Sequence, residues 1–196
     1  MAVSTIGTNA ITDATIATGD IADDAVTVAK TSGVGFGVQN VDQFRLTSNF
    51  TGDAQPIASN LSRVSEVGTG GGAVGTQMAV SSGIFTFPQT GMYLVKYNIT
   101  ALIGSNGEDG KVMPYIEITV NNSDYTTVAD GQFNLADDGN GTNARGSTEI
   151  NFLYDVTNTT THKIRFSIDV ANTSTQTNGN TNQNRTYVTF IRLGDT

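Results

Sequence analysis

The chain has 196 residues, which is enough for one domain of ordinary size and a short appendage. Its net charge of −8 disfavours nucleic acid as a partner, because the phosphates would be repelled. It contains no cysteine, which excludes disulfides, and no apolar run approaches the roughly 20 residues of a membrane span, so we expect no membrane insertion.

The start of the chain and the cysteine count together set an expectation for where the protein is made. Residues 1–5 show no basic start followed by an apolar stretch, so we expect no signal peptide. A chain without cysteine is typical of a reducing compartment. We therefore expect assembly in a cytoplasm.

Residues 1–33 form an arm in which a large apolar residue recurs at every fifth position, at Ile6, Ile11, Ile16, Ile21 and Val26. A period of five fits neither a helix nor a strand. One chain cannot bury these side chains, because each repeat has a single large apolar group, whereas three parallel chains could bury them along a shared axis. The spacing therefore predicts a trimer seam, with a flexible polar tail as the alternative.

The arm also resembles the short repeats of bacteriophage fibre and virion-surface proteins. Residues 25–30 read Ala-Val-Thr-Val-Ala-Lys, and the five-residue isoleucine spacing is similar to theirs. The resemblance implies an anchor on a virion, with the major capsid protein or another virion protein as partner. It further implies a virion-surface location after synthesis in the host cytoplasm. Residues 34–39 follow as a glycine-rich linker.

Residues 40–196 predict a globular head made of short strands. Apolar residues alternate clearly in the stretch 162–170, with Arg165 and Asp169 on the opposite face. Tyr115 similarly lies opposite the apolar face of its strand. No helical periodicity of useful length occurs, which favours a β-sandwich. We expect strands at residues 41–47, 60–65, 78–80, 84–87, 92–101, 111–120, 147–156, 162–170 and 185–193.

Residues 82–97 carry the most specific pattern of the head. Phe85 and Phe87 lie two positions apart, on one face of a short strand. Pro88 ends this strand, and Gly91 gives the backbone the freedom to turn. Four residues fall on one face of the next strand, namely Tyr93, Val95, Tyr97 and Ile99.

This pattern resembles the signature of the tumour necrosis factor (TNF) and complement C-one-q superfamily. The resemblance implies an all-β jelly-roll sandwich of ten strands, in which these two strands form a central pair and the final strand lies centrally. It also implies a homotrimer. The residues that would then build the head core and the trimer contacts are Phe85, Phe87, Tyr93 and Tyr97.

Three long polar loops are expected at residues 104–110, 134–146 and 172–184. Loops on a rigid sandwich are common binding sites, although solvated connectors are the plainer alternative. Five oxygen-bearing residues in them are candidate ligand groups: Asp109, Asp137, Asp138, Asn140 and Asn143. Calcium is the one cofactor that such donors suggest, and some members of the superfamily bind it in head loops, but ordinary turns use the same residue types.

Two patterns that could indicate an enzyme lack their required context. Residues 70–75 match G-x-G-x-x-G, but strand-like residues rather than a helix follow. The single histidine, His162, begins an ordinary strand and has no nucleophile elbow or cysteine to act with. We therefore predict no catalytic site and no metal site of the usual ligands.

Association and display remain as the expected function. The first possibility is a capsid decoration or head fibre, favoured because the arm is short and no large tail-attachment domain precedes the head. The second is a receptor-binding tail-fibre tip that recognises host surface glycans or proteins. The third, a secreted ligand of the complement-head type, would be expected to carry a signal peptide and cysteines.

Overall fold

The computed structural model describes residues 38–64, 71–104, 107–137 and 139–196. The arm residues Ile6, Ile11, Ile16, Ile21 and Val26, and most of the linker, lie outside this range, so the trimer seam stays a prediction. The described chain is all-β. Its strands are β1 (Asn40–Leu46), β2 (Phe50–Thr51), β3 (Leu61–Arg63), β4 (Ala79–Ser81), β5 (Ile84–Thr86), β6 (Gly91–Ile103), β7 (Asp109–Thr119), β8 (Thr126–Asp130), β9 (Phe133–Leu135), β10 (Ala144–Val156), β11 (Lys163–Val170), β12 (Gln176–Thr177) and β13 (Tyr187–Gly194).

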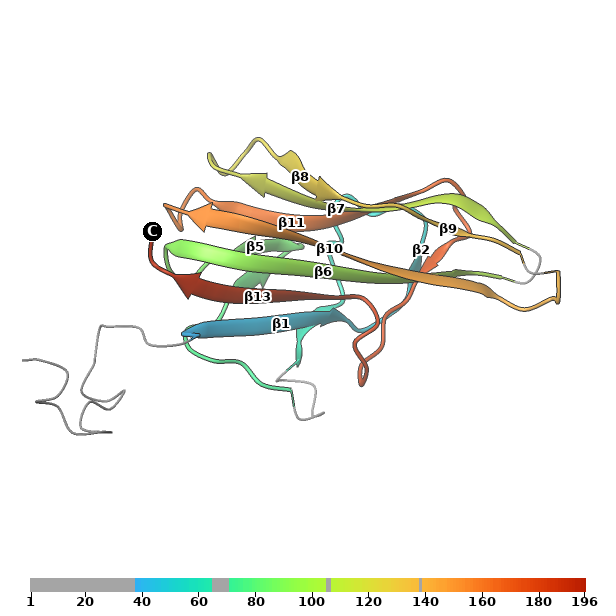
Figure 1. Ribbon diagram of the computed structural model, residues 1–196, viewed down its shortest axis with the longest axis horizontal. Coiled ribbons are helices and arrows are strands. Elements are labelled where there is room, and N and C mark those ends of the chain that lie inside the picture. Colours follow the sequence, from blue (N-terminus) through green and yellow to red (C-terminus); the bar gives the residue numbers. More distant parts are fainter. Residues whose placement is uncertain (1–37, 65–70, 105–106, 138) are drawn as a thin grey trace, which may run out of the picture. The chain divides into compact units, whose positions relative to one another are not determined.

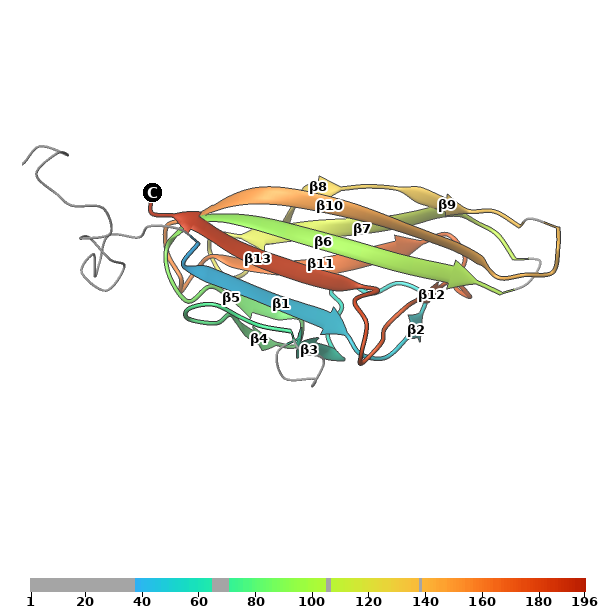
Figure 2. The same ribbon diagram turned by 60° about the horizontal axis from the view of Figure 1, so that its bottom comes forward.

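The strands form two antiparallel sheets that face each other (Figures 1 and 2). Sheet A has the order β2-β12-β6-β13-β1-β3, and β10 pairs with the other side of β6. Sheet B has the order β4-β5-β11-β7-β8, and β9 also pairs with β7. The predicted jelly-roll β-sandwich is confirmed, and all nine expected strands are present.

The two strands of the signature do not pair with each other, which corrects the expectation of a central strand pair. β5 lies in sheet B between β4 and β11, whereas β6 lies in sheet A between β10 and β13. The turn through Pro88 carries the chain from one sheet to the other. Gly91, at the end of this turn, has a φ of +130°, and a Cβ there would lie 2.3 Å from the carbonyl oxygen of Gly194. The signature therefore marks a crossing between sheets, and glycine is required where it ends.

The core lies between the sheets and is rich in aromatic rings. Phe85 of β5 sits near its centre, with its ring 5.1 Å from the ring of Phe44 and 5.1 Å from that of Phe190, both in sheet A. The four residues predicted to share one face of β6 all point inward and are at most 1% exposed. Burial of each such side chain contributes about 1.5–3 kcal/mol, so the inward faces of β5 and β6 hold the two layers together.

The last strand is central, as the resemblance implied. β13 pairs with β6 on one side and with β1 on the other. Asn40 lies opposite Arg192, so the C-terminus lies beside the start of β1 (Figure 1). The buried Arg192 side chain joins the two, because its Nη1 donates to Gln39 Oε1 at 3.0 Å and its Nη2 donates to Asp195.

Four short strands, β2, β8, β9 and β12, were not expected from the sequence. β12 lies inside the predicted loop 172–184, and there Thr175, Thr177 and Asn178 are buried. Its pairing with β2 and β6 supplies backbone hydrogen bonds that a polar sequence does not reveal. The prediction of a solvated or ligand-binding loop is therefore wrong for residues 175–179, whereas residues 181–184 are exposed.

Buried tyrosines make the sandwich sensitive to alkali. Burial raises the pKa of Tyr97, and burial raises that of Tyr154 to about 12. An unfolded tyrosine ionises near pH 10, so the folded state binds these protons more tightly than the unfolded state does. Their contribution to stability is complete below about pH 10 and is lost as the pH rises toward 12.

We expect the urea midpoint to be clearly lower at about pH 11 than at about pH 7. Tyr154→Phe removes one ionising group and should reduce this pH dependence. The tyrosinate absorbance should rise together with unfolding. An equal midpoint at both pH values would contradict the prediction.

Candidate functional site

The outward face of sheet B carries a row of paired charges and aromatic rings. Arg165 of β11 donates to both carboxylate oxygens of Glu117 on β7, at 2.9 and 3.1 Å. Its guanidinium also lies 4.0 Å from the ring centroid of Tyr125. Further along the same two strands, Lys111 Nζ lies 2.7 Å from Asp169. This face therefore has rigid, mutually neutralised charges.

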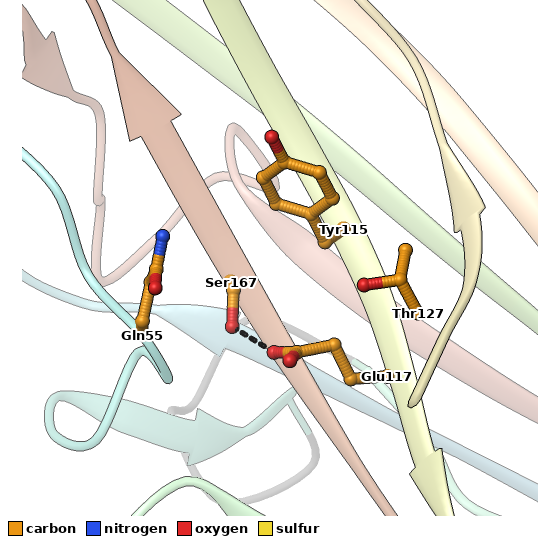
Figure 3. Close-up of a pocket in the computed structure, with 5 residues that line it drawn as sticks. All are labelled: Gln55, Tyr115, Glu117, Thr127 and Ser167. Carbon is orange, nitrogen blue, oxygen red and sulfur yellow. Dashed lines mark hydrogen bonds between the residues drawn. The ribbon is translucent and has the colours of Figure 1, made fainter. Parts of the chain in front are cut away.

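A small depression opens on this face, with a volume of about 110 Å³ (Figure 3). Its lining comes from β7, β8, β11 and the loop before β3. The residues are Gln55, Tyr115, Glu117, Thr127 and Ser167. Adjacent antiparallel strands place these side chains together, because residues two apart on a strand share a face.

The floor of the depression is fixed by hydrogen bonds. Ser167 is 1% exposed and donates its hydroxyl to Glu117 Oε2, the oxygen that also accepts from Arg165 Nε. Tyr115 forms one wall, and burial together with the nearby carboxylate of Asp169 raises its pKa. Its hydroxyl therefore stays neutral at neutral pH.

Asp109 is a structural residue, which corrects its prediction as a ligand group. It is 1% exposed, and both carboxylate oxygens are occupied. Oδ1 accepts from the backbone N–H groups of Lys111 and Ala171, at 2.9 and 3.2 Å. Oδ2 accepts from the N–H of Asn172 at 3.2 Å and from Thr175 Oγ1 at 2.5 Å. The carboxylate holds the segment after β11 against the start of β7.

The other candidate ligand residues lie in the turn between β9 and β10, at the end of the sandwich opposite the C-terminus (Figure 1). Asp137 Oδ1 accepts from the N–H of Gly139 at 3.0 Å, which is ordinary turn chemistry. Asn140 and Asn143 are exposed, and Asp138 lies outside the described residues. Within the described ranges no cluster of three or more His, Cys, Asp or Glu side chains could hold a metal ion. Calcium binding at this turn remains a prediction.

The outward face of sheet A carries a row of apolar side chains, here named the apolar row. Cα pairing connects its members across five segments, in the order Val74, Val41, Ile191, Leu94 and Leu153. Leu153 and Val74 are 57% and 51% exposed. The next two outward rows are polar, and Lys96 of one forms an ion pair of 2.8 Å with Glu149 of the other. Apolar side chains thus lie next to one another across sheet A, from Val74 at one edge to Leu153 of β10 at the other.

The aromatic residues assigned to both core and trimer contacts lie inside one protomer. Phe85, Phe87, Tyr93 and Tyr97 are each at most 1% exposed. They therefore have no surface to offer to a second chain, and any trimer contact has to come from other residues.

The two enzyme-like patterns have plain structural roles among the described residues. Val74, within the glycine-rich stretch, forms an isolated bridge with Val41 of β1, and strand β4 follows. His162 stacks on Tyr154 with ring centroids 5.8 Å apart, and its ring nitrogens lie 3.2 Å from the hydroxyls of Thr157 and Thr161. Neither environment resembles a nucleotide site or a catalytic triad.

Comparison with known proteins identifies the fold. No protein-family model matches the sequence, and no curated protein matches it. Similar solved structures include murine APRIL at pH 5.0, with 12% identity and a TM-score of 0.55 over 79% of this chain and 98% of that one. Murine APRIL at pH 8.5 is similar at 13% identity and a TM-score of 0.53, over 79% and 98%. Eiger TNF from S. frugiperda gives 10% identity and a TM-score of 0.56, over 82% and 96%.

The fold is a TNF-like jelly roll. At these identities the likeness concerns the fold alone. Within the described ranges no helix is long and apolar enough to cross a membrane. The TNF-like head presents two faces of functional interest, the apolar row on sheet A and the depression on sheet B.

Sequence reasoning missed both faces. Tyr115 gave a usable signal, because an aromatic residue on the polar face of a strand is unusual. Gln55 and Thr127 gave none, since one lies in a turn and the other in a strand that was not expected. The apolar row was hidden because each member belongs to a different segment, and only the strand register aligns them.

Proposed function

We propose that the chain is a non-enzymatic protein that self-associates as a homotrimer and displays its TNF-like head on a virion surface. The apolar row on the outward face of sheet A supports self-association. It spans hydrogen-bonded strands, and Leu153 at its β10 end is 57% exposed. A contiguous apolar surface of this kind is typical of a protein interface.

A second copy of the chain fits this surface better than a charged partner does. The row itself contains no charged residue, and the flanking charges Lys96 and Glu149 are already paired with each other. Closed cyclic symmetry allows each copy to use one surface to receive its neighbour and another to contact the next copy. The TNF-like jelly roll is compatible with this arrangement, and the isoleucine spacing of the arm also predicts an assembly of three chains.

The change Leu153→Glu is expected to weaken the trimer by at least about tenfold, because it places a charge in an apolar contact. The Leu153 side chain is exposed when the protomer is alone, so the head of the variant should still fold. The measurement is the mass of the full chain over a dilution series. Val120→Glu is the matched control, since Val120 is 58% exposed at the end of β7 in sheet B. A monomeric wild-type chain, or unchanged assembly of Leu153→Glu, would contradict the proposal.

The virion role is supported by the repeats of the arm, with the major capsid protein or another virion protein as the partner. Antibody labelling of intact phage particles tests it. Label over the head shell supports a capsid decoration or head fibre, and label on the tail supports a receptor-binding tip. A trimer that is absent from particles would overturn the virion role and favour a secreted ligand, which the TNF-like fold fits equally well.

A further inference from the structure

The depression on the outward face of sheet B contains polar groups that the fold does not use. Among the described residues, the side chains of Gln55 and Thr127 make no hydrogen bond. The hydroxyl of Tyr115 lies 3.6 Å from Met113 Sδ and also interacts with the carboxylate of Asp169. Glu117 Oε1 accepts one bond, from Arg165 Nη2, which leaves one of its lone pairs available. Donors and acceptors thus converge from four segments (Figure 3).

The charges around the depression select against an ionic ligand. Glu117 is neutralised by the bidentate contact with Arg165, and Asp169 is neutralised by Lys111 at 2.7 Å. A charged ligand would therefore meet no free counter-charge. A neutral ligand with hydroxyl groups suits the free groups, because a hydroxyl both donates to Glu117 or the Gln55 carbonyl and accepts from the Gln55 amide or Thr127.

The walls combine these polar groups with one available aromatic ring. Tyr125 is covered by the guanidinium of Arg165, whereas Tyr115 is half-buried and lines the depression. Small-molecule sites commonly combine an aromatic wall with a few fixed polar groups. The C–H face of a pyranose ring can pack on such a wall while its hydroxyls reach the floor.

The size of the depression limits the ligand. One water needs about 10–15 Å³ of such space, so a volume of about 110 Å³ accommodates several waters or one sugar ring. We propose that the depression lined by Gln55, Tyr115, Glu117, Thr127 and Ser167 binds a single neutral sugar ring, such as the terminal residue of a glycan. The site lies within one protomer and on sheet B, whereas the apolar row lies on sheet A.

Saturation-transfer NMR on the full chain tests this inference. The probes are the methyl glycosides of glucose, galactose, mannose and N-acetylglucosamine at millimolar concentration. At least one is expected to receive saturation. Thr127→Val, which keeps the shape of the side chain, should weaken binding roughly three- to tenfold, as expected for one lost hydrogen bond. Gln55→Ala should have a similar effect.

Thr126→Val is the matched control, because neighbouring residues on β8 point to opposite faces. It should bind the glycoside as the wild type does. Tyr115→Phe should retain more binding than Tyr115→Ala, because it keeps the aromatic wall. Equal unfolding midpoints verify that the variants fold.

Two results would overturn the inference. One is the absence of saturation transfer to every probe. The other is equal binding by Thr127→Val, Gln55→Ala and the wild type, which would place the sugar elsewhere. Failure of trimer formation in the mass measurement would leave the glycoside result unaffected, so the two proposals are tested separately.

Discussion

Replacing Asp42 by Ala is expected to lower the free energy of unfolding by about 3–5 kcal/mol, the usual cost of removing one partner from a buried ion pair. Asp42 of β1 points into the sandwich, and its side chain is 4% exposed. It accepts from Arg63 Nε at 3.1 Å and from the backbone N–H of Met78 at 2.9 Å. In the variant, Arg63 Nε and this N–H lose their carboxylate acceptor, whereas Arg63 Nη2 still donates to the carbonyl oxygen of Met78.

The size of this effect depends on burial, and the structure offers a matched comparison. The side chain of Arg63 is 14% exposed, whereas Lys111 and Asp169 form a similar pair with 37% and 26% exposure. Asp169→Ala should therefore move the urea midpoint much less, because water solvates the remaining lysine. Equal shifts for Asp42→Ala and Asp169→Ala would contradict the assignment of Asp42 to a buried network.

A double-mutant cycle separates the pair from its surroundings. Asp42→Ala combined with Arg63→Ala should cost less than the sum of the two single changes, because the second change removes the positive charge that the Asp42 carboxylate had balanced. Urea unfolding of all three variants measures this coupling. Strict additivity would mean that the two side chains act independently.

Replacing Asp109 by Ala is expected to destabilise the head by about 2–4 kcal/mol, since each buried donor left without a partner costs about 1–3 kcal/mol and water can reach some of them. Three backbone N–H groups and the hydroxyl of Thr175 depend on this carboxylate. Amide hydrogen exchange should accelerate around β12, because the segment that leads into it is released.

Asp137→Ala is the control for Asp109→Ala. Both residues were candidate ligand groups, but Asp137 is exposed and makes one turn contact with Gly139. Asp137→Ala should therefore have little effect on the urea midpoint or on the amide exchange rates. If Asp137→Ala destabilised the chain as much as Asp109→Ala, the structural role of Asp109 would be wrong.

The strand pattern was readable from the sequence because a half-buried strand alternates between apolar and polar residues. β11 shows this alternation over its whole length and β6 shows it from Val95 to Ala101, and both strands were expected within a few residues of their bounds. β8 and β12 were not expected, because most of their residues are polar or small, and the partners of β12 are also distant in the chain. Short edge strands depend on a neighbour that is already in place.

The sequence by itself determined that the head is an all-β sandwich and that the inward residues of β6 belong to the core of the sandwich. It also determined that the last strand, β13, lies in the middle of a sheet. The strands and the inward residues of β6 follow from local periodicity, which one chain segment carries alone, whereas the central place of β13 was implied by the resemblance to the TNF superfamily. The tertiary structure decided the rest. It placed β5 and β6 in opposite sheets, turned Asp109 into a buried acceptor, and aligned the apolar row and the sugar-sized depression. Each of these depends on strand register, which brings together residues as far apart in the chain as Val41 and Ile191 and leaves no local pattern.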